Sequence, residues 1–191
     1  MKIAIDISQL AYPNTGVSNY LESLVCEMVK DESKEFVLFF SSLRINVPRS
    51  MQELAKRRNV TIKAYKFPPL ALHAMWNTIH KLPIEKFVGN VDLFLSSDWT
   101  EPPAKKAMKA TILYDLIVYK YPEETHSQTE FSLNKLRLSS NIVKIQKKKL
   151  SWVKKESDVI FCISEATKRD AVEILGLDKN KLRVIYPGAT A

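Results

Sequence analysis

The chain has 191 residues, of which 46% are hydrophobic and 26% charged, and its formal net charge is +8. This length and composition predict one globular α/β domain, or one with a small appendage, that buries about 70% of its unfolded surface without disulfides or metals. The positive charge favours an anionic partner such as acidic lipid or a phosphorylated ligand. The sequence shows no zinc finger, RNA-binding aromatic signature or helix-turn-helix pattern, so we expect no nucleic-acid partner.

The first 30 residues predict a strand, a loop and a helix. Residues 2–7 are mostly apolar, as expected for a central parallel strand and not for a signal peptide. The polar loop 8–19 carries Gly16, and a helix over 18–30 follows. This arrangement presents backbone N–H groups to an anion, although the loop lacks the G-x-G-x-x-G spacing of a dinucleotide fold. A plain βα turn and a phosphate contact both remain open interpretations.

The middle of the chain alternates between short apolar runs and helical spacings. The predicted elements are strands 35–40, 60–65, 93–95 and 111–114, and helices 51–58 and 70–82. Strand 93–95 leads into a polar loop with Asp98 and Trp99, and strand 111–114 ends at Asp115. Polar groups therefore follow two successive strands.

A long helix is predicted over 127–156, and its later part is strongly basic. Lysines alternate there with Ile, Leu, Trp and Val. The pattern is typical of an interfacial helix that presents Lys147, Lys148, Lys149 and Trp152 to acidic lipid. It is also typical of a helix face in water, because charge runs usually face solvent.

The last predicted unit is strand, helix, strand. Residues 159–163 form a buried strand, Ser164 has the chemistry of a helix N-cap, and the helix ends at Gly176 before strand 182–186. Such a unit belongs to a parallel sheet, in which ligands bind at the carboxyl ends of the strands. Ser164 is therefore either a structural cap or a group that faces a ligand.

Together these elements predict an α/β fold: a Rossmann-like, doubly wound, mostly parallel sheet of six to seven strands with helices on both faces. Cys26 and Cys162 stand in apolar contexts without a close partner, which predicts buried free thiols and no metal site. No apolar run approaches the roughly 18 residues that span a bilayer. We therefore expect a cytoplasmic protein, peripheral on the inner face of the membrane if it binds lipid.

Five segments, in this order, resemble the N-terminal domain of family 4 glycosyltransferases. They are residues 1–6 (MKIAID), 15–20 (TGVSNY), 114–116 with 121–123 (YDL and YPE), 157–170 (SDVIFCISEATKRD) and 184–189 (VIYPGA). The resemblance implies one lobe of a two-domain GT-B architecture and a retaining, metal-independent hexosyltransferase of cell-envelope polysaccharide synthesis. It implies no cofactor, a nucleotide-sugar donor as co-substrate, and a glycan or lipid-linked acceptor.

By position, the resemblance implies roles for ten residues of this chain. The implied sets are catalytic Tyr114 and Asp115; Gly16, Val17, Ser164 and Lys168 at the donor phosphate and cleft; and Asn14, Thr15, Asp98 and Trp99 at the acceptor. Tyr114 stands where the family usually has histidine. A phenol can donate a hydrogen bond, but it does not carry a proton near neutral pH as imidazole does.

The resemblance also implies domain boundaries. Residues 1–186 match the acceptor-side domain, residues 187–191 match the start of the interdomain linker, and the family's C-terminal nucleotide-sugar-binding domain has no counterpart in this sequence. We therefore expect the chain to be inactive alone and to require that domain as a partner.

Two other functions are compatible with a Rossmann-like domain. The first is a non-catalytic module that binds anionic lipid or a phosphorylated ligand through its basic face. The second is a nicotinamide oxidoreductase, against which count the glycine-poor first loop and the lack of an acidic residue closing the second strand.

Overall fold

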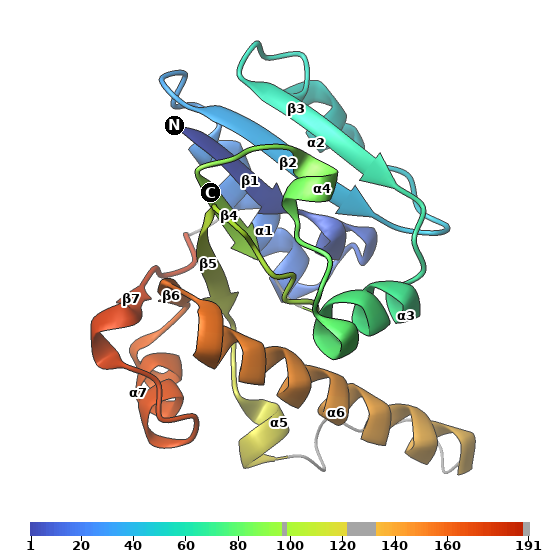
Figure 1. Cartoon of the computed structure of the whole chain (residues 1–191), viewed down its shortest axis with the longest axis vertical. Coiled ribbons are helices and arrows are strands. Elements are labelled where there is room, and N and C mark those ends of the chain that lie inside the picture. Colours follow the sequence, from blue (N-terminus) through green and yellow to red (C-terminus); the bar gives the residue numbers. More distant parts are fainter. Residues whose placement is uncertain (97–98, 122–132, 189–191) are drawn as a thin grey trace.

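The computed structural model describes residues 1–96, 99–121 and 133–188, with the backbone alone for 133–142. Its centre is one sheet of seven parallel strands in the order β3-β2-β1-β4-β5-β6-β7 (Figure 1). The strands are β1 (Lys2–Asp6), β2 (Glu35–Ser41), β3 (Val60–Tyr65), β4 (Leu93–Ser96), β5 (Met108–Leu113), β6 (Val159–Cys162) and β7 (Leu182–Val184). This topology confirms the predicted doubly wound α/β sheet.

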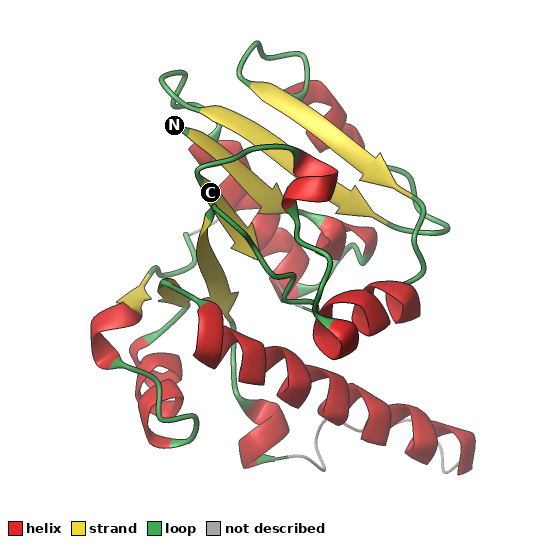
Figure 2. Cartoon of the chain, viewed as in Figure 1, coloured by secondary structure: helices red, strands yellow, loops and turns green. Residues whose placement is uncertain are grey.

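Helices connect most of the successive strands. They are α1 (Gly16–Met28), α2 (Arg49–Leu54), α3 (Pro69–Leu72), α4 (Glu85–Val88), α5 (Ile117–Lys120), α6 (Leu133–Glu156) and α7 (Glu165–Glu173). A π-helical segment, η2 (His73–Ile79), continues α3, and two 3-10 turns, η1 (Ser8–Ala11) and η3 (Lys179–Lys181), complete the set. Figure 2 shows helices in front of the strands and behind them.

The strands alternate their side chains between two hydrophobic layers. Ile3 and Ile5 of β1 pack in one layer with Leu21 of α1, while Ala4 packs in the other layer with Trp76 of η2. Because both faces of the sheet are covered, β1 and β2 are almost continuously apolar. The same burial makes these strands recognisable in the sequence.

Several element boundaries differ from the sequence prediction. The short helices α4 and α5 were not predicted. The predicted helix 70–82 is α3 followed by η2, and the next residue, His80, takes a left-handed conformation. Strand β5 begins three residues earlier than predicted, because the buried side chain of Lys109 interrupts the apolar pattern. Residues 127–132 of the predicted long helix lie outside the described residues.

The two cysteines are free, but only one is fully buried. Burial raises the pKa of the Cys162 thiol to about 11, which leaves it protonated near neutral pH. Cys26 is partly exposed, so the prediction of two buried thiols is correct for Cys162 alone. Within the described ranges, the helices lack the length and hydropathy needed to cross a membrane.

Phe39 of β2 is expected to be a main contributor to stability. Its ring lies 5.5 to 6.1 Å from the rings of Tyr65, Trp76 and Phe87. Replacing Phe39 with alanine leaves a cavity among these rings and should reduce the free energy of unfolding by about 3–5 kcal/mol in urea denaturation. Leu43→Ala is the control, since that side chain is 53% exposed; equal effects of the two substitutions would contradict this account of the core.

Candidate functional site

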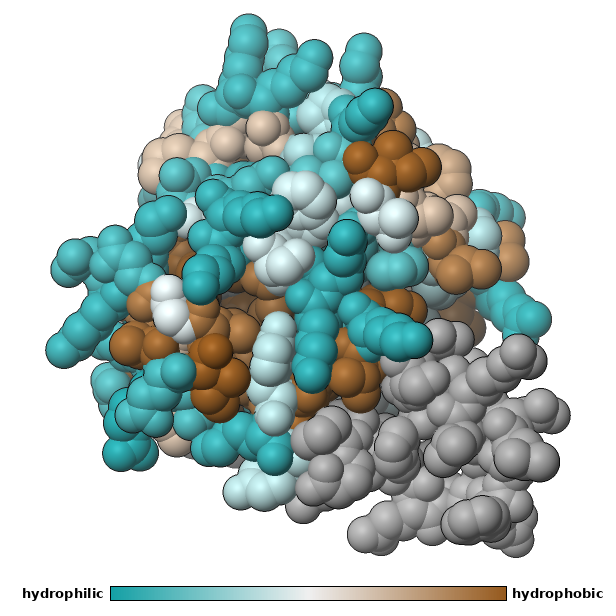
Figure 3. All heavy atoms as spheres, turned by 60° about the horizontal axis from the view of Figure 1, so that its bottom comes forward, coloured by the Kyte–Doolittle hydropathy of each residue, from teal (hydrophilic) through white to brown (hydrophobic). Residues whose placement is uncertain are grey.

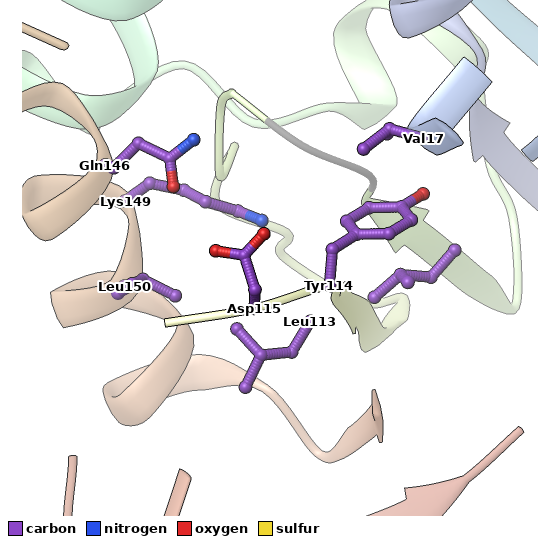
Figure 4. A pocket seen from close by; sticks show the side chains of 8 residues that line it. Val17, Leu113, Tyr114, Asp115, Gln146, Lys149 and Leu150 are labelled. Carbon is purple, nitrogen blue, oxygen red and sulfur yellow. The ribbon is translucent and has the colours of Figure 1, made fainter. Parts of the chain in front are cut away.

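A pocket of about 120 Å³ lies at the carboxyl end of β5, between the start of α1 and the inner side of α6 (Figure 4). It is lined by Val17, Ile112, Leu113, Tyr114, Asp115, Gln146, Lys149 and Leu150. Three segments that are far apart in the sequence therefore meet at this edge of the sheet. In open parallel sheets, this edge is where ligands bind.

The first segment is the start of α1. The Thr15 hydroxyl accepts a hydrogen bond from the Ser18 N–H at 3.1 Å and caps the helix. Asn14 takes a left-handed conformation with φ of 65°, and Asn14, Thr15 and Gly16 are all exposed. The other first-turn N–H groups carry the partial positive charge of the helix dipole, and this turn adjoins the pocket through Val17.

The second segment is the end of β5. Tyr114 is buried, and its ring meets the Tyr20 ring edge-on with centroids 5.7 Å apart. Asp115 is exposed, and its Oδ1 accepts the Ile117 N–H at 3.0 Å, which orients the carboxylate at the start of α5. In Figure 4 the Asp115 carboxylate points towards Lys149 across the pocket.

Ser164 caps α7, and its hydroxyl accepts the Thr167 N–H at 3.0 Å. The Thr167 hydroxyl in turn donates to the Tyr114 carbonyl at 3.1 Å. The corner after β6 is therefore fastened to the end of β5, although neither Ser164 nor the partly buried Lys168 is among the pocket-lining residues. The expected roles of both at the donor phosphate remain predictions.

Of the two predicted acceptor residues after β4, only Trp99 is described, and it does not line the pocket. Asp98 lies outside the described residues. Trp99 is partly buried, and its carbonyl accepts a hydrogen bond from the side-chain amide of Asn77 at 2.8 Å. The segment after β4 is thus held from the side of the π-helical segment.

The third segment is α6, where two of the four residues predicted to face a membrane point into the protein instead. Lys147 and Lys148 are exposed, but Lys149 is only 3% exposed and lines the pocket. Trp152 also faces inwards: its indole N–H donates to the Asn77 carbonyl at 2.9 Å, and its ring stacks on His80 at 3.6 Å. Successive helical residues are about 100° apart around the axis, so three consecutive lysines cannot share one face.

Sequence reasoning missed Asp6 at the carboxyl end of β1. Its side chain is 4% exposed, and Oδ1 accepts the Ser8 N–H at 2.9 Å. Burial raises the pKa of the Asp6 carboxyl, while the hydrogen bonds from Ser8 and the charge of Lys149 oppose that rise. The available signal was a single acidic residue near the carboxyl end of an otherwise mostly apolar strand.

A network of charged side chains holds the segment 99–101, which follows β4, against β5 and α6. Glu101 is completely buried, and its carboxylate lies 3.1 Å from the Lys109 ammonium and accepts the Ser96 hydroxyl at 2.6 Å. The Lys109 ammonium also lies 2.8 Å from Glu156 of α6, whose second oxygen lies 2.8 Å from His80. The network therefore joins β4, β5, α6 and η2.

Charge pairing at Glu156 and hydrogen bonds from Asn77 stabilise this network. Burial raises the pKa of Glu156, but the hydrogen bonds and charges of Lys109 and His80 outweigh it and hold the pKa below its usual value. The Glu101 N–H donates to Asn77 Oδ1 at 2.9 Å, so Asn77 binds both ends of the segment 99–101. Across the described ranges, no cluster of three or more His, Cys, Asp and Glu residues is arranged to hold a metal ion.

Comparisons with known proteins were made at the levels of family, sequence and structure. No family model and no curated protein matches the chain. Among solved structures, the chain is similar to Phytolacca americana UGT2 complexed with UDP-2fluoro-glucose and pterostilbene, with a TM-score of 0.48 and 10% sequence identity. The alignment covers 98% of this chain and 52% of that one, so the chain spans about half the length of UGT2.

Removing Lys109 should expose how strongly the buried network depends on it. Lys109→Met leaves Glu101 buried without its countercharge, and we expect the free energy of unfolding to fall by about 3–5 kcal/mol in urea denaturation. Lys105→Met, at an exposed position in the preceding loop, should change it by less than about 0.5 kcal/mol. Adding Glu101→Gln to Lys109→Met should recover part of the loss, and a double variant no more stable than the single one would argue against this ion pair.

Proposed function

We propose that the chain is the acceptor-binding half of a retaining glycosyltransferase that moves a sugar from a nucleotide-sugar donor to a glycan or lipid-linked acceptor. Residues 1–186 would be the acceptor-side lobe and 187–191 the start of a linker to a donor-binding domain. The observation that carries the proposal is the meeting of Val17, Tyr114 and Asp115 at one pocket, because they belong to two of the segments that resemble the family. A third such segment is tied to Tyr114 through Thr167.

The proposal assigns the protein side chains binding and orientation, not nucleophilic attack. Asp115 would accept a hydrogen bond from a sugar hydroxyl, and the donor phosphate would act as the base for the incoming hydroxyl. Stabilising a leaving diphosphate requires positioned cations or dipoles. Lys149 is the only cation among the described pocket-lining residues. The chain alone should therefore bind a nucleotide sugar weakly and transfer nothing at a useful rate.

Gly16 offers a sharp test, because the fold itself does not require glycine there. A Cβ at Gly16 would have no neighbour within 4 Å, and its φ is not positive. Gly16→Ala should leave stability unchanged or raise it by up to about 1 kcal/mol. If a diphosphate approaches the start of α1 closely, the same methyl group should block it.

The measurement is saturation-transfer NMR with UDP-glucose and GDP-mannose, together with an assay for released nucleotide. The wild-type chain should give saturation transfer from at least one of the two donors without nucleotide release. Gly16→Ala should abolish the signal, while Ser23→Ala, at an exposed position of the same helix, should retain it. Robust turnover by the 191-residue chain alone, or no contact with either donor, would overturn the proposal.

A second function, binding to acidic lipid, is favoured by a basic apolar patch beside α6. The patch consists of Ile79, Lys81, Leu82 and Lys155. Ile79 is 61% exposed, Leu82 is 37% exposed, and the Lys155 ammonium lies 4.7 Å from the centre of the Trp152 ring. Figure 3 shows hydrophobic side chains exposed between hydrophilic ones on the underside of the molecule. Apolar side chains flanked by lysines suit an anionic membrane surface.

Vesicle co-sedimentation tests this patch directly. We expect binding to phosphatidylglycerol-containing vesicles, none to pure phosphatidylcholine, and weakening by salt. Lys155→Gln should weaken binding about fivefold, since a lysine near an anionic surface contributes about 1 kcal/mol. Ile79→Glu should also weaken it, whereas Leu43→Glu, at an exposed apolar position in the loop between β2 and α2, should not. Binding that ignores lipid charge, or equal effects of both Glu substitutions, would reject the patch.

A further inference from the structure

The wall of the pocket formed by α6 lies outside every segment that resembles the family. It consists of Gln146, Lys149 and Leu150. Gln146 and Lys149 are three residues apart, so they project from the same side of the helix. Leu150 and Val153 are buried in the hydrophobic core under β6, which fixes this part of α6 against the sheet. The two polar side chains are therefore presented from a rigid element.

The burial of Lys149 needs an explanation, because a lysine is rarely this inaccessible without a compensating partner. Only 3% of Lys149 is exposed. Its charge acts on the buried carboxyl of Asp6 at the end of β1, and Figure 4 shows its amino group directed towards the Asp115 carboxylate. The charge of Lys149 therefore acts at the ends of both β1 and β5.

This balance of charge bears on the chemistry of the ligand. Among the described residues, the Lys149 ammonium faces the Asp115 carboxylate and acts on the buried acidic group of Asp6, so a phosphate or carboxylate in the pocket would meet repulsion as well as attraction. A hydroxyl group fits better because it both donates and accepts. It can donate to the Asp115 carboxylate and accept from the Lys149 ammonium or the Gln146 amide.

The size and apolar lining of the pocket agree with a sugar. At about 30 Å³ per water molecule, a volume of about 120 Å³ holds about four waters, so the pocket admits one edge of a monosaccharide ring with its hydroxyl groups. Ile112, Leu113 and Leu150 offer an apolar surface against which the C–H groups of a sugar ring can pack. Polar and apolar side chains therefore both line the pocket, and a pyranose likewise has both polar and apolar surface.

We infer that Lys149 and Gln146 of α6, facing Asp115, bind the hydroxyl groups of one uncharged sugar unit in this pocket. This inference rests on the proposed function and deepens it: the sugar unit is neutral at the pocket, and any anionic part of the substrate lies elsewhere. Lys149 and Gln146 are then binding residues that determine which hydroxyl pattern is accepted.

The test is titration of the ¹⁵N-labelled chain with methyl α-glucoside, methyl α-mannoside and methyl α-galactoside, and separately with inorganic phosphate. At least one glycoside should shift the amide signals of residues 113–115 and 146–150, and phosphate should not. Lys149→Met and Gln146→Leu should each weaken the apparent affinity about tenfold or more, because each removes a hydrogen bond to the sugar. Lys148→Met, the exposed neighbour on the same helix, should change it less than about twofold.

The outcomes separate this inference from the proposed function. Phosphate shifts at these amides, unchanged affinity in both variants, or no glycoside shift at all would overturn the inference. Should Lys149→Met fail to fold, Gln146→Leu decides, because it removes no charge. Glycoside binding in the pocket without any nucleotide-sugar contact at Gly16 would keep the inference and remove the glycosyltransferase proposal.

Discussion

All seven strands run in the same direction, and this constraint determines where chemistry can occur in the molecule. The carboxyl ends of the strands meet at one edge, so the loops that follow β1, β4, β5 and β6 are neighbours despite their distance in the sequence. The rest of the sheet is covered by helices and carries few polar side chains. Asp6, Asp115 and Ser164 therefore occupy the same edge, because Asp6 is the last residue of β1 and the other two each lie two residues after the end of a strand.

The two buried lysines have different roles: Lys109 holds a backbone segment in place, and Lys149 lines the pocket. Lys109 joins Glu101 to Glu156 and fixes the segment 99–101, whereas Lys149 lies in the pocket near Asp6. Burying charged groups is costly, and their pairing recovers only part of that cost. At Lys109 the pairing determines the position of a backbone segment. At Asp6 burial still raises the pKa, as is common where a fold keeps ionisable groups beside a binding site.

The fold was predictable because burial on both faces makes β1, β2, β4 and β6 short apolar runs. The boundary of β5 was not, because a buried lysine at position 109 looks like a surface residue until its partners from α6 and the loop after β4 are known. The same limit explains Lys149. Three consecutive lysines look equivalent in the sequence, and only the packing of α6 decides that one of them points into the pocket.

Tyr114 stands where the family that the sequence resembles usually has histidine, and its surroundings explain what a tyrosine does at this position. Its ring belongs to the hydrophobic layer that contains α1 and meets Tyr20 edge-on, so it forms part of the wall between core and pocket. Tyr20 in turn donates to the Ile185 carbonyl at 3.4 Å, which links that wall to the chain after β7. An imidazole would fill this apolar position less completely and would bring a proton that titrates near neutral pH. The position is thus better suited to shaping the wall of the pocket than to transferring a proton.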